Sequence, residues 1–172
     1  MLTYDHDREL LRRMLAAGNA AVYLVRHGKA GSRSAWTDAD ELRPLSKTGR
    51  RQAEGLVRAF RGLEVELVLS SPYVRCIQTV RPLALDRGLT VEVADVLTEG
   101  APLAPVLELV EELASTPAVL CSHGDVIPAV VLHLAEVGMR IDGERDWQKG
   151  SVWVLEREGG RFTRGRYLAP LG

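Results

Sequence analysis

Cysteines and long hydrophobic runs are scarce in this sequence of 172 residues. The two cysteines, Cys76 and Cys121, lack the paired spacing of a metal site, so we expect buried, reduced thiols rather than a disulfide or a metal centre. No apolar run approaches the ~18 residues that cross a bilayer, and no basic segment followed by an apolar one opens the chain. These absences predict a soluble, cytoplasmic protein.

The sequence also lacks an excess of either charge. Its 22 basic and 23 acidic side chains give a formal net charge of −1. Nucleic-acid polymers and membrane surfaces attract strongly basic proteins, so we expect neither as a partner. Recognition of a small anion would therefore depend on a local cluster of basic side chains.

Hydrophobic residues make up 46% of the chain, which is enough for one domain with a sizeable core. Short apolar runs that suit strands alternate with segments of helical period, and this alternation predicts an α/β domain with a largely parallel central sheet. The expected strands are residues 21–25, 66–69, 90–93, 118–121 and 152–156, with a further one near 162–167.

Four helices are expected between these strands. Two of them repeat apolar residues at the i, i+3, i+4, i+7 spacing of a single buried face, one over residues 53–60 and one over 106–113. The residue types favoured at a helix N-cap precede three of the helices, and these are Ser46, Ser71 and Asp125.

Residues 1–19 read as an amphipathic helical extension that ends at Gly18-Asn19, and residues 20–172 read as the domain itself. We expect the extension to dock on the domain, with a partner-binding element as the alternative. Two histidines, His6 in the extension and His133 inside a helix, are interpreted as structural.

Polar side chains that carry chemistry follow three of the expected strands. Arg26 and His27 end the first strand, Arg75 lies in the first turn of the helix after the second strand, and His123 ends the fourth strand. Open α/β sheets bind ligands at the carboxyl ends of their strands. If the four side chains converge, they make a compact cationic pocket suited to phosphate oxygens.

Four sequence motifs resemble the histidine phosphatase superfamily, which also contains the phosphoglycerate mutases. In chain order they are VYLVRHGKA, RPLSKTGRRQA, SSPYVRCIQT and SHGD. Together they resemble the small bacterial phosphohistidine phosphatases of the SixA type. When the later motif KGSVWVL is included, the sequence is even more similar to another group, the histidine-phosphatase domain attached to a Nudix domain in some MutT-type nucleotide hydrolases. No Nudix box is present, so the chain would be that domain standing alone. The resemblance implies a three-layer α/β/α sandwich of the phosphoglycerate mutase type.

The same resemblance implies roles for the four converging residues. His27 would be the nucleophile that takes a phosphoryl group and passes it to water, while Arg26, Arg75 and His123 would bind the phosphoryl oxygens without a metal or cofactor. A neutral imidazole suits this role near pH 7. The sequence does not say which ring nitrogen attacks.

Further residues have expected but less specific roles. Glu99 is the expected general acid, with a solvated loop carboxylate as the alternative reading, and Asp95 and Asp125 are fallback acids. Ser32, Arg33 and Arg43 are expected to bind substrate, together with Lys29, although each of these residues also suits a soluble loop. Two tryptophans, Trp36 and Trp147, would either stack on a base near the site or pack in the core.

The expected substrate is a phosphohistidine protein, a nucleotide or a small phosphate ester. Two other functions stay open at this point. A phosphomutase is disfavoured because 172 residues leave little room for insertions that close over a sugar acid. A non-catalytic phosphate- or phosphoprotein-binding module is disfavoured because a binder has no need of His27 as a nucleophile.

Overall fold

Seven strands form one mixed sheet in the computed structural model, which describes residues 21–113 and 115–172. The strand order across the sheet is β3-β2-β4-β1-β6-β7-β5. The bounds are β1 Ala21–Arg26, β2 Leu67–Ser70, β3 Val91–Val93, β4 Ala118–Ser122, β5 Arg140–Asp142, β6 Val152–Glu158 and β7 Arg161–Leu168.

The half of the sheet formed by β1 to β4 is parallel throughout, and β6 pairs antiparallel with both β1 and β7. The predicted α/β class with a largely parallel sheet is confirmed. All six expected strands are present, but β5 was not predicted. Its three residues, Arg140, Ile141 and Asp142, include two charged side chains, so the strand has neither an apolar run nor an alternating pattern.

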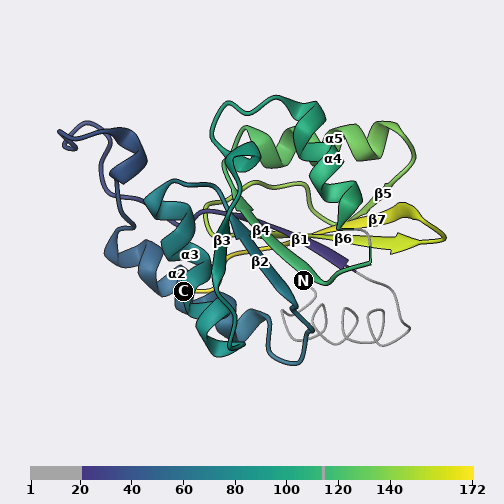
Figure 1. Cartoon of the computed structure of the whole chain (residues 1–172), viewed down its shortest axis with the longest axis horizontal. Helices are drawn as coiled ribbons and strands as arrows, with labels where there is room; N and C mark the ends of the chain where they lie inside the picture. The colour runs from purple at the N-terminus through teal and green to yellow at the C-terminus, as the bar shows by residue number, and fades with distance from the viewer. Residues whose placement is uncertain (1–20, 114) are drawn as a thin grey trace.

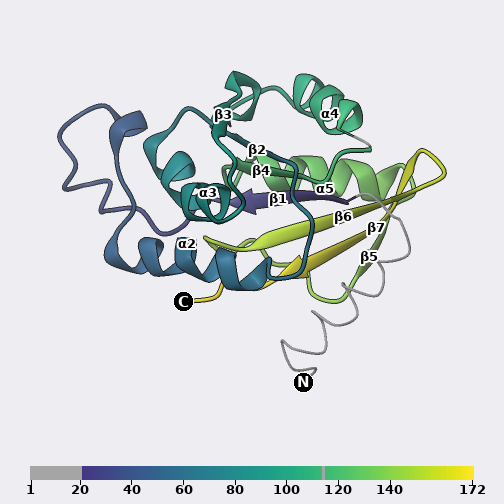
Figure 2. The same ribbon diagram turned by 60° about the horizontal axis from the view of Figure 1, so that its bottom comes forward.

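Helices cover both faces of the sheet, as Figures 1 and 2 show. One face carries α2 (Lys47–Ala59) and α3 (Val74–Asp86), and the other carries α4 (Leu103–Glu112) and α5 (Val126–Glu136). Alternate residues of β1 contribute to two separate cores, with Tyr23 on the side of α2 and α3 and Leu24 on the side of α4 and α5. This is the three-layer sandwich that the resemblance implied.

The starts of three helices test the predicted N-caps. Ser46 caps α2 as expected, because its hydroxyl accepts the backbone N–H of Gly49 at 3.1 Å. The prediction for Ser71 was wrong: α3 begins at Val74, and the Ser71 hydroxyl is engaged by His123 instead. Asp125 does precede α5, but its side chain makes no cap there.

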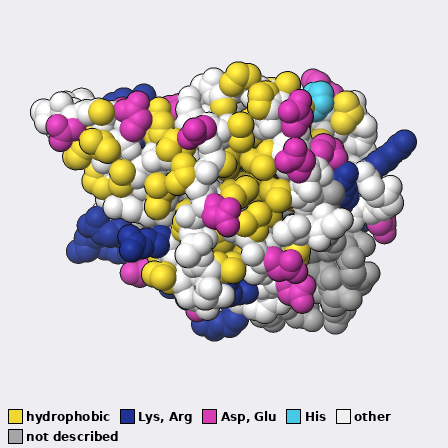
Figure 3. All heavy atoms as spheres, viewed as in Figure 1, with side chains coloured by type: hydrophobic (Ala, Val, Ile, Leu, Met, Phe, Trp, Pro, Cys, Tyr) yellow, Lys and Arg dark blue, Asp and Glu magenta, His cyan; other side chains and the backbone are white. Residues whose placement is uncertain are grey.

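Two short 3-10 helices, η1 (Asp40–Leu42) and η2 (Asp95–Leu97), lie in the loops after β1 and β3. Hydrophobic side chains show near the centre of the face in Figure 3. On the edge strand β3, Val93 is 55% exposed. Among the described helices, none is long and apolar enough to pass through a membrane. The predicted extension at residues 1–19, with His6, lies outside the described residues.

Candidate active site

The parallel register of β1, β4 and β2 brings their carboxyl ends to one edge of the sheet. Arg26 pairs with Ser122, and the N–H of His27 donates to the Ser122 carbonyl oxygen at 3.1 Å. On the other side of β4, the N–H of Ser71 donates to the Cys121 carbonyl oxygen at 2.9 Å. The residues that follow the three strands therefore meet at this edge, as the sequence predicted.

His27 lies at the centre of this edge and is 7% exposed. Its Nδ1 lies 2.8 Å from the carbonyl oxygen of Gly28. Because a carbonyl oxygen only accepts, Nδ1 carries the proton and donates it, which leaves the lone pair on Nε2. Burial lowers the pKa of His27 to about 3, and the nearby His123, Arg75 and Arg26 lower it further against the opposing effect of the Gly28 hydrogen bond. The ring is thus neutral at pH 7 with a nucleophilic Nε2.

His123 lies beside His27, with ring centroids 5.3 Å apart, and is almost fully buried. Its Nε2 is hydrogen-bonded to the Ser71 hydroxyl at 2.8 Å and lies 3.5 Å from the Cys76 sulfur. Among the described residues, its buried Nδ1 has no hydrogen-bond partner. A buried polar atom without a partner carries a desolvation cost, so Nδ1 is an available ligand for an anion beside His27.

Arg26 extends from the end of β1 across the backbone of Gly124. A Cβ at position 124 would lie 2.6 Å from the guanidinium carbon, so any larger residue would displace the side chain. One terminal nitrogen donates to the carbonyl oxygen of Trp147, and the buried Nε has no partner in the part of the chain that the structure describes. Burial lowers the pKa of Arg26, although nearby Asp125 and Asp146 act in the opposite direction. Arg26 therefore retains an unused donor.

Arg75 is fully buried, and oxygen atoms contact the end of its guanidinium. Its NH1 donates to the Asp40 carbonyl oxygen at 2.8 Å, and its NH2 contacts the carboxylates of Asp40 at 3.0 Å and Glu99 at 3.1 Å. The guanidinium carbon also lies 4.6 Å from the centre of the Tyr73 ring, which in turn packs against His123. The four predicted residues converge, but carboxylates hold the end of Arg75.

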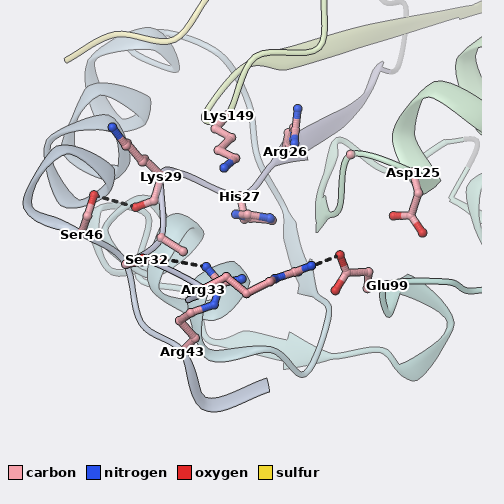
Figure 4. Close-up of a pocket in the computed structure, with 13 residues that line it drawn as sticks. Arg26, His27, Lys29, Ser32, Arg33, Arg43, Ser46, Glu99, Asp125 and Lys149 are labelled. Atoms are coloured by element: carbon pink, nitrogen blue, oxygen red, sulfur yellow. Dashed lines mark hydrogen bonds and ion pairs between the residues drawn. The ribbon is translucent and has the colours of Figure 1, made fainter. Parts of the chain in front are cut away.

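A pocket of about 770 Å³ opens above His27. Figure 4 shows the side chains around it, which come from the loop after β1, the start of α2, and the loops that precede α4, α5 and β6. Five basic residues line the pocket, namely Arg26, Lys29, Arg33, Arg43 and Lys149, against two acidic ones, Glu99 and Asp125. A chain with a net charge of −1 thus concentrates positive charge at this pocket.

The three predicted substrate-binding residues, Ser32, Arg33 and Arg43, all line the pocket. Arg43 is 6% exposed and donates to the Asp40 carboxylate and the Gly31 carbonyl oxygen, both at 2.8 Å. The exposed Arg33 lies 3.4 Å from the carboxylates of both Asp40 and Glu99. These ion pairs join the loop after β1 to the segment that carries Glu99.

The acid candidates differ in what they contact. Glu99 lines the pocket, and its two oxygens contact Arg75 and Arg33. Asp125 also lines the pocket, and one of its oxygens accepts the backbone N–H of Gly100 at 2.7 Å. Asp95 is exposed in η2 and is not among the lining residues. Of the three acid candidates, Glu99 and Asp125 are therefore the two that line the pocket of His27.

The two tryptophans and the two cysteines singled out in the sequence are not among the residues that line the pocket. Trp147 stacks on Trp153 with centroids 5.0 Å apart, which is the packing alternative for this residue. Trp36 donates to the carbonyl oxygen of its neighbour Ala39. Cys76 and Cys121 are both buried and free, as predicted.

Sequence reasoning missed several residues of the site. Asp40 contacts Arg75, Arg43 and Arg33, yet nothing in the sequence marks it out within a loop rich in charge. Lys149 belongs to the KGSVWVL motif that supported the resemblance, so a signal was present for this residue. Ser71, predicted as a helix cap, instead holds His123.

Thr79 and Gln52 also escaped notice. The Gly28 N–H donates to the Thr79 hydroxyl at 2.9 Å, and that hydroxyl donates to the Arg75 carbonyl oxygen at 2.6 Å. The Gln52 side chain accepts the Lys29 N–H and donates to the Lys149 carbonyl oxygen. Each of the two side chains lies on a helix and contacts a segment that is distant in sequence. The periodicity of the helix therefore does not reveal either contact.

Comparisons with known proteins agree with the resemblance. Residues 22–101 match the histidine phosphatase superfamily (branch 1). A curated relative, the 8-oxo-(d)GTP phosphatase of Mycolicibacterium smegmatis, is 36% identical over 179 residues, which cover 98% of this chain and 55% of the relative. The chain thus spans about half the length of that relative.

Solved structures share the fold. A protein histidine phosphatase SixA complexed with tungstate superposes with a TM-score of 0.66 at 23% identity, covering 88% of this chain and 96% of the other. A mycobacterial glucosyl-3-phosphoglycerate phosphatase with bound VO3 gives a TM-score of 0.62 at 20% identity, covering 87% and 98%. At these identities the likeness establishes the three-layer fold, while the sequence matches point to the family.

Proposed function

This chain belongs to the histidine phosphatase superfamily, and we propose that it is a phosphatase in which Nε2 of His27 accepts a phosphoryl group and then passes it to water. One observation carries the proposal. Nδ1 of His27 donates to the Gly28 carbonyl oxygen, so the neutral ring keeps its lone pair on Nε2 beside a cationic pocket.

In the first step, the Nε2 lone pair attacks phosphorus. With an ester or a nucleotide, the P–N bond to His27 forms as the P–O bond to the leaving group breaks, and the leaving oxygen takes the bonding electrons and a proton from Glu99 or Asp125. With a phosphohistidine protein, the bond that breaks is the P–N bond of the substrate, and its ring nitrogen keeps the electrons. The Gly28 carbonyl oxygen stabilises the positive charge that develops on the ring through its hydrogen bond from Nδ1. The unpartnered Arg26 Nε and His123 Nδ1 are suited to hold the phosphoryl oxygens.

In the second step, water attacks the phosphohistidine. The P–N bond breaks, its electrons return to Nε2, and the water gives up a proton as phosphate forms. Glu99 and Asp125 are the two proposed proton carriers, since both line the pocket. Arg75 joins the phosphoryl oxygens once Asp40 and Glu99 release it.

The proposed substrates are a phosphohistidine protein, a nucleotide or a small phosphate ester. The 8-oxo-(d)GTP phosphatase activity named for the curated relative supports the nucleotide, and the likeness to the SixA structure supports the phosphohistidine protein. Five basic residues around the pocket suit any of these anions.

Phosphate release in the presence of EDTA tests this proposal. The panel comprises an aryl phosphate, nucleotides, sugar phosphates and a histidine-phosphorylated carrier protein, each with the wild type, His27→Ala and the control His133→Ala. We expect activity that resists EDTA and falls at least about 10³-fold in His27→Ala only, because loss of a nucleophile removes the covalent route.

Activity retained in His27→Ala would overturn the covalent mechanism. Binding of inorganic phosphate without phosphate release from any substrate would favour the non-catalytic binding module instead.

A further inference from the structure

Lys149 lies in the loop between β5 and β6 and lines the same pocket as His27. In Figure 4 its ammonium group points toward the His27 ring, whereas the side chain of Lys29 points away from it. Within the described part of the chain, no carboxylate forms an ion pair with Lys149. The pocket therefore holds an unpaired cation aimed at the nucleophile.

Two sets of hydrogen bonds fix the backbone of Lys149 relative to His27. The Gln52 side-chain amide donates to the Lys149 carbonyl oxygen at 2.9 Å and accepts the Lys29 N–H at 2.8 Å. The next residue, Gly150, donates its N–H to the carbonyl oxygens of Arg26 and His27 at 3.0 and 3.1 Å. Gly150 has φ +83°, a conformation that favours glycine.

The charges around Lys149 point to an anion. Burial lowers its pKa, and the positive charges of Arg26, Arg43, Lys29 and Arg33 lower it further. Cations brought together in this way repel one another, and a bound anion relieves the repulsion. Arg26 and His123 already offer donors for the phosphoryl group on His27, so Lys149 is free for a second anionic group.

We propose that Lys149 binds a phosphate that serves as the leaving group, so that the preferred substrates are phosphoanhydrides rather than esters of neutral alcohols. This inference rests on the proposed function. The P–N bond forms at His27 while the bond from phosphorus to the bridging oxygen breaks, and the bridging oxygen keeps the electrons. The Lys149 ammonium stabilises the negative charge that develops there.

This role also fits the state of Glu99, whose two oxygens contact arginines. A phosphate is a weaker base than an alkoxide, so it needs less proton assistance as it leaves. The Lys149 ammonium stabilises the negative charge on the leaving phosphate directly, so the reaction depends less on a general acid.

Comparison of two substrates tests the proposal through turnover. We would measure kcat/KM for inorganic pyrophosphate and for phenyl phosphate, in EDTA, with the wild type and with Lys149→Gln. Loss of a charge-assisted hydrogen bond predicts a fall of about 10- to 100-fold for pyrophosphate and less than about threefold for phenyl phosphate.

Lys29→Gln is the matched control, because it removes one positive charge from the same pocket at a side chain that points away from His27. We expect this variant to shift both substrates by a similar factor. An equal loss on both substrates in Lys149→Gln, or no loss on either, would overturn the proposal.

Calorimetric binding gives a readout that does not depend on turnover. In a His27→Ala background, Lys149→Gln should weaken the binding of pyrophosphate about tenfold and that of inorganic phosphate less than about threefold. Equal weakening of both ligands would contradict a leaving-group role. If the wild type releases no phosphate but this selective weakening persists, the proposed phosphatase activity fails while the second phosphate site stands.

Discussion

Two arginines at one edge of the sheet, Arg75 fully buried and Arg26 half-buried, have different surroundings. Arg75, on α3, is held by the Asp40 carbonyl oxygen and by the carboxylates of Asp40 and Glu99. Arg26, at the end of β1, contacts a backbone carbonyl oxygen and has a buried Nε without a partner. Both lie near His27, since both charges lower its pKa.

The difference bears on how each arginine would serve the proposed phosphate site. At Arg75 the oxygens of Asp40 and Glu99 occupy the donors that would bind phosphoryl oxygens. Among the described residues no carboxylate forms an ion pair with Arg26, whose terminal nitrogen donates to a backbone carbonyl oxygen, while the Nε atoms of both arginines are buried without a partner. We therefore expect the terminal nitrogens of Arg75 to exchange carboxylate oxygens for phosphoryl oxygens when an anion binds, an exchange that Arg26 does not need.

Of the changes that test this difference between the two arginines, removal of Arg75 should lower kcat/KM the most. Arg75→Ala leaves Asp40 and Glu99 without this buried partner and removes a donor from the phosphoryl group, so we expect kcat/KM to fall about 10²- to 10³-fold. Arg43→Ala should cost about tenfold, because Arg43 contacts Asp40 and a loop carbonyl oxygen rather than the transferred group. Phosphate release measures both.

Circular dichroism would show whether each of these two variants remains folded. Equal losses in folded Arg75→Ala and Arg43→Ala would contradict the assignment of Arg75 to the phosphoryl group.

A smaller effect should follow from Asp40→Asn, which neutralises one carboxylate on Arg75. An amide competes less well than a carboxylate for the guanidinium, so inorganic phosphate should bind about three- to tenfold more tightly. Asp38→Asn, in the same loop and exposed, is the control and should leave phosphate binding unchanged. Weaker binding in Asp40→Asn would mean that Asp40 positions Arg75 for phosphate instead of competing with it.

The smallest expected effect is a change in the stability of the fold with pH. Burial lowers the pKa of His27 from an ordinary value near 6.5 to about 3, so the folded ring stays neutral while the unfolded ring protonates below about pH 6.5. Stability is therefore lost as pH falls from about 6.5 toward 3. The thermal midpoint should fall more steeply in the wild type than in His27→Gln between pH 6.5 and 4.

Titration of the His27 ring followed by NMR checks the same point directly. We expect no protonation of this ring between pH 8 and 4.5. A midpoint between pH 6 and 7 would contradict the buried, neutral nucleophile.

Much of this site could be predicted because it follows strand ends. Arg26, His27 and His123 come directly after apolar runs, and a parallel sheet places such residues at one edge. The predicted sheet class followed from the same alternation of strands and helices. These features are local in sequence, so a pattern of a few residues is enough to reveal them.

The remaining features depend on contacts between distant segments. Asp40 meets Arg75 across 35 positions, and Gln52 meets Lys149 across 97. The path of the loop after β1 decides the first contact, and the packing of α2 beside the loop before β6 decides the second. The Ser71 cap failed for a similar reason, because its hydroxyl is engaged by His123, which follows another strand.

Identification of the phosphorylated nitrogen tests the central claim most directly. The wild type would be mixed with its best substrate, quenched in base within milliseconds, and examined by ³¹P NMR and by peptide mass spectrometry. We expect phosphorus attached to Nε2 of His27, because Nδ1 is held by the Gly28 carbonyl oxygen. Phosphorus on Nδ1 of His27, or on any other residue, would contradict this account.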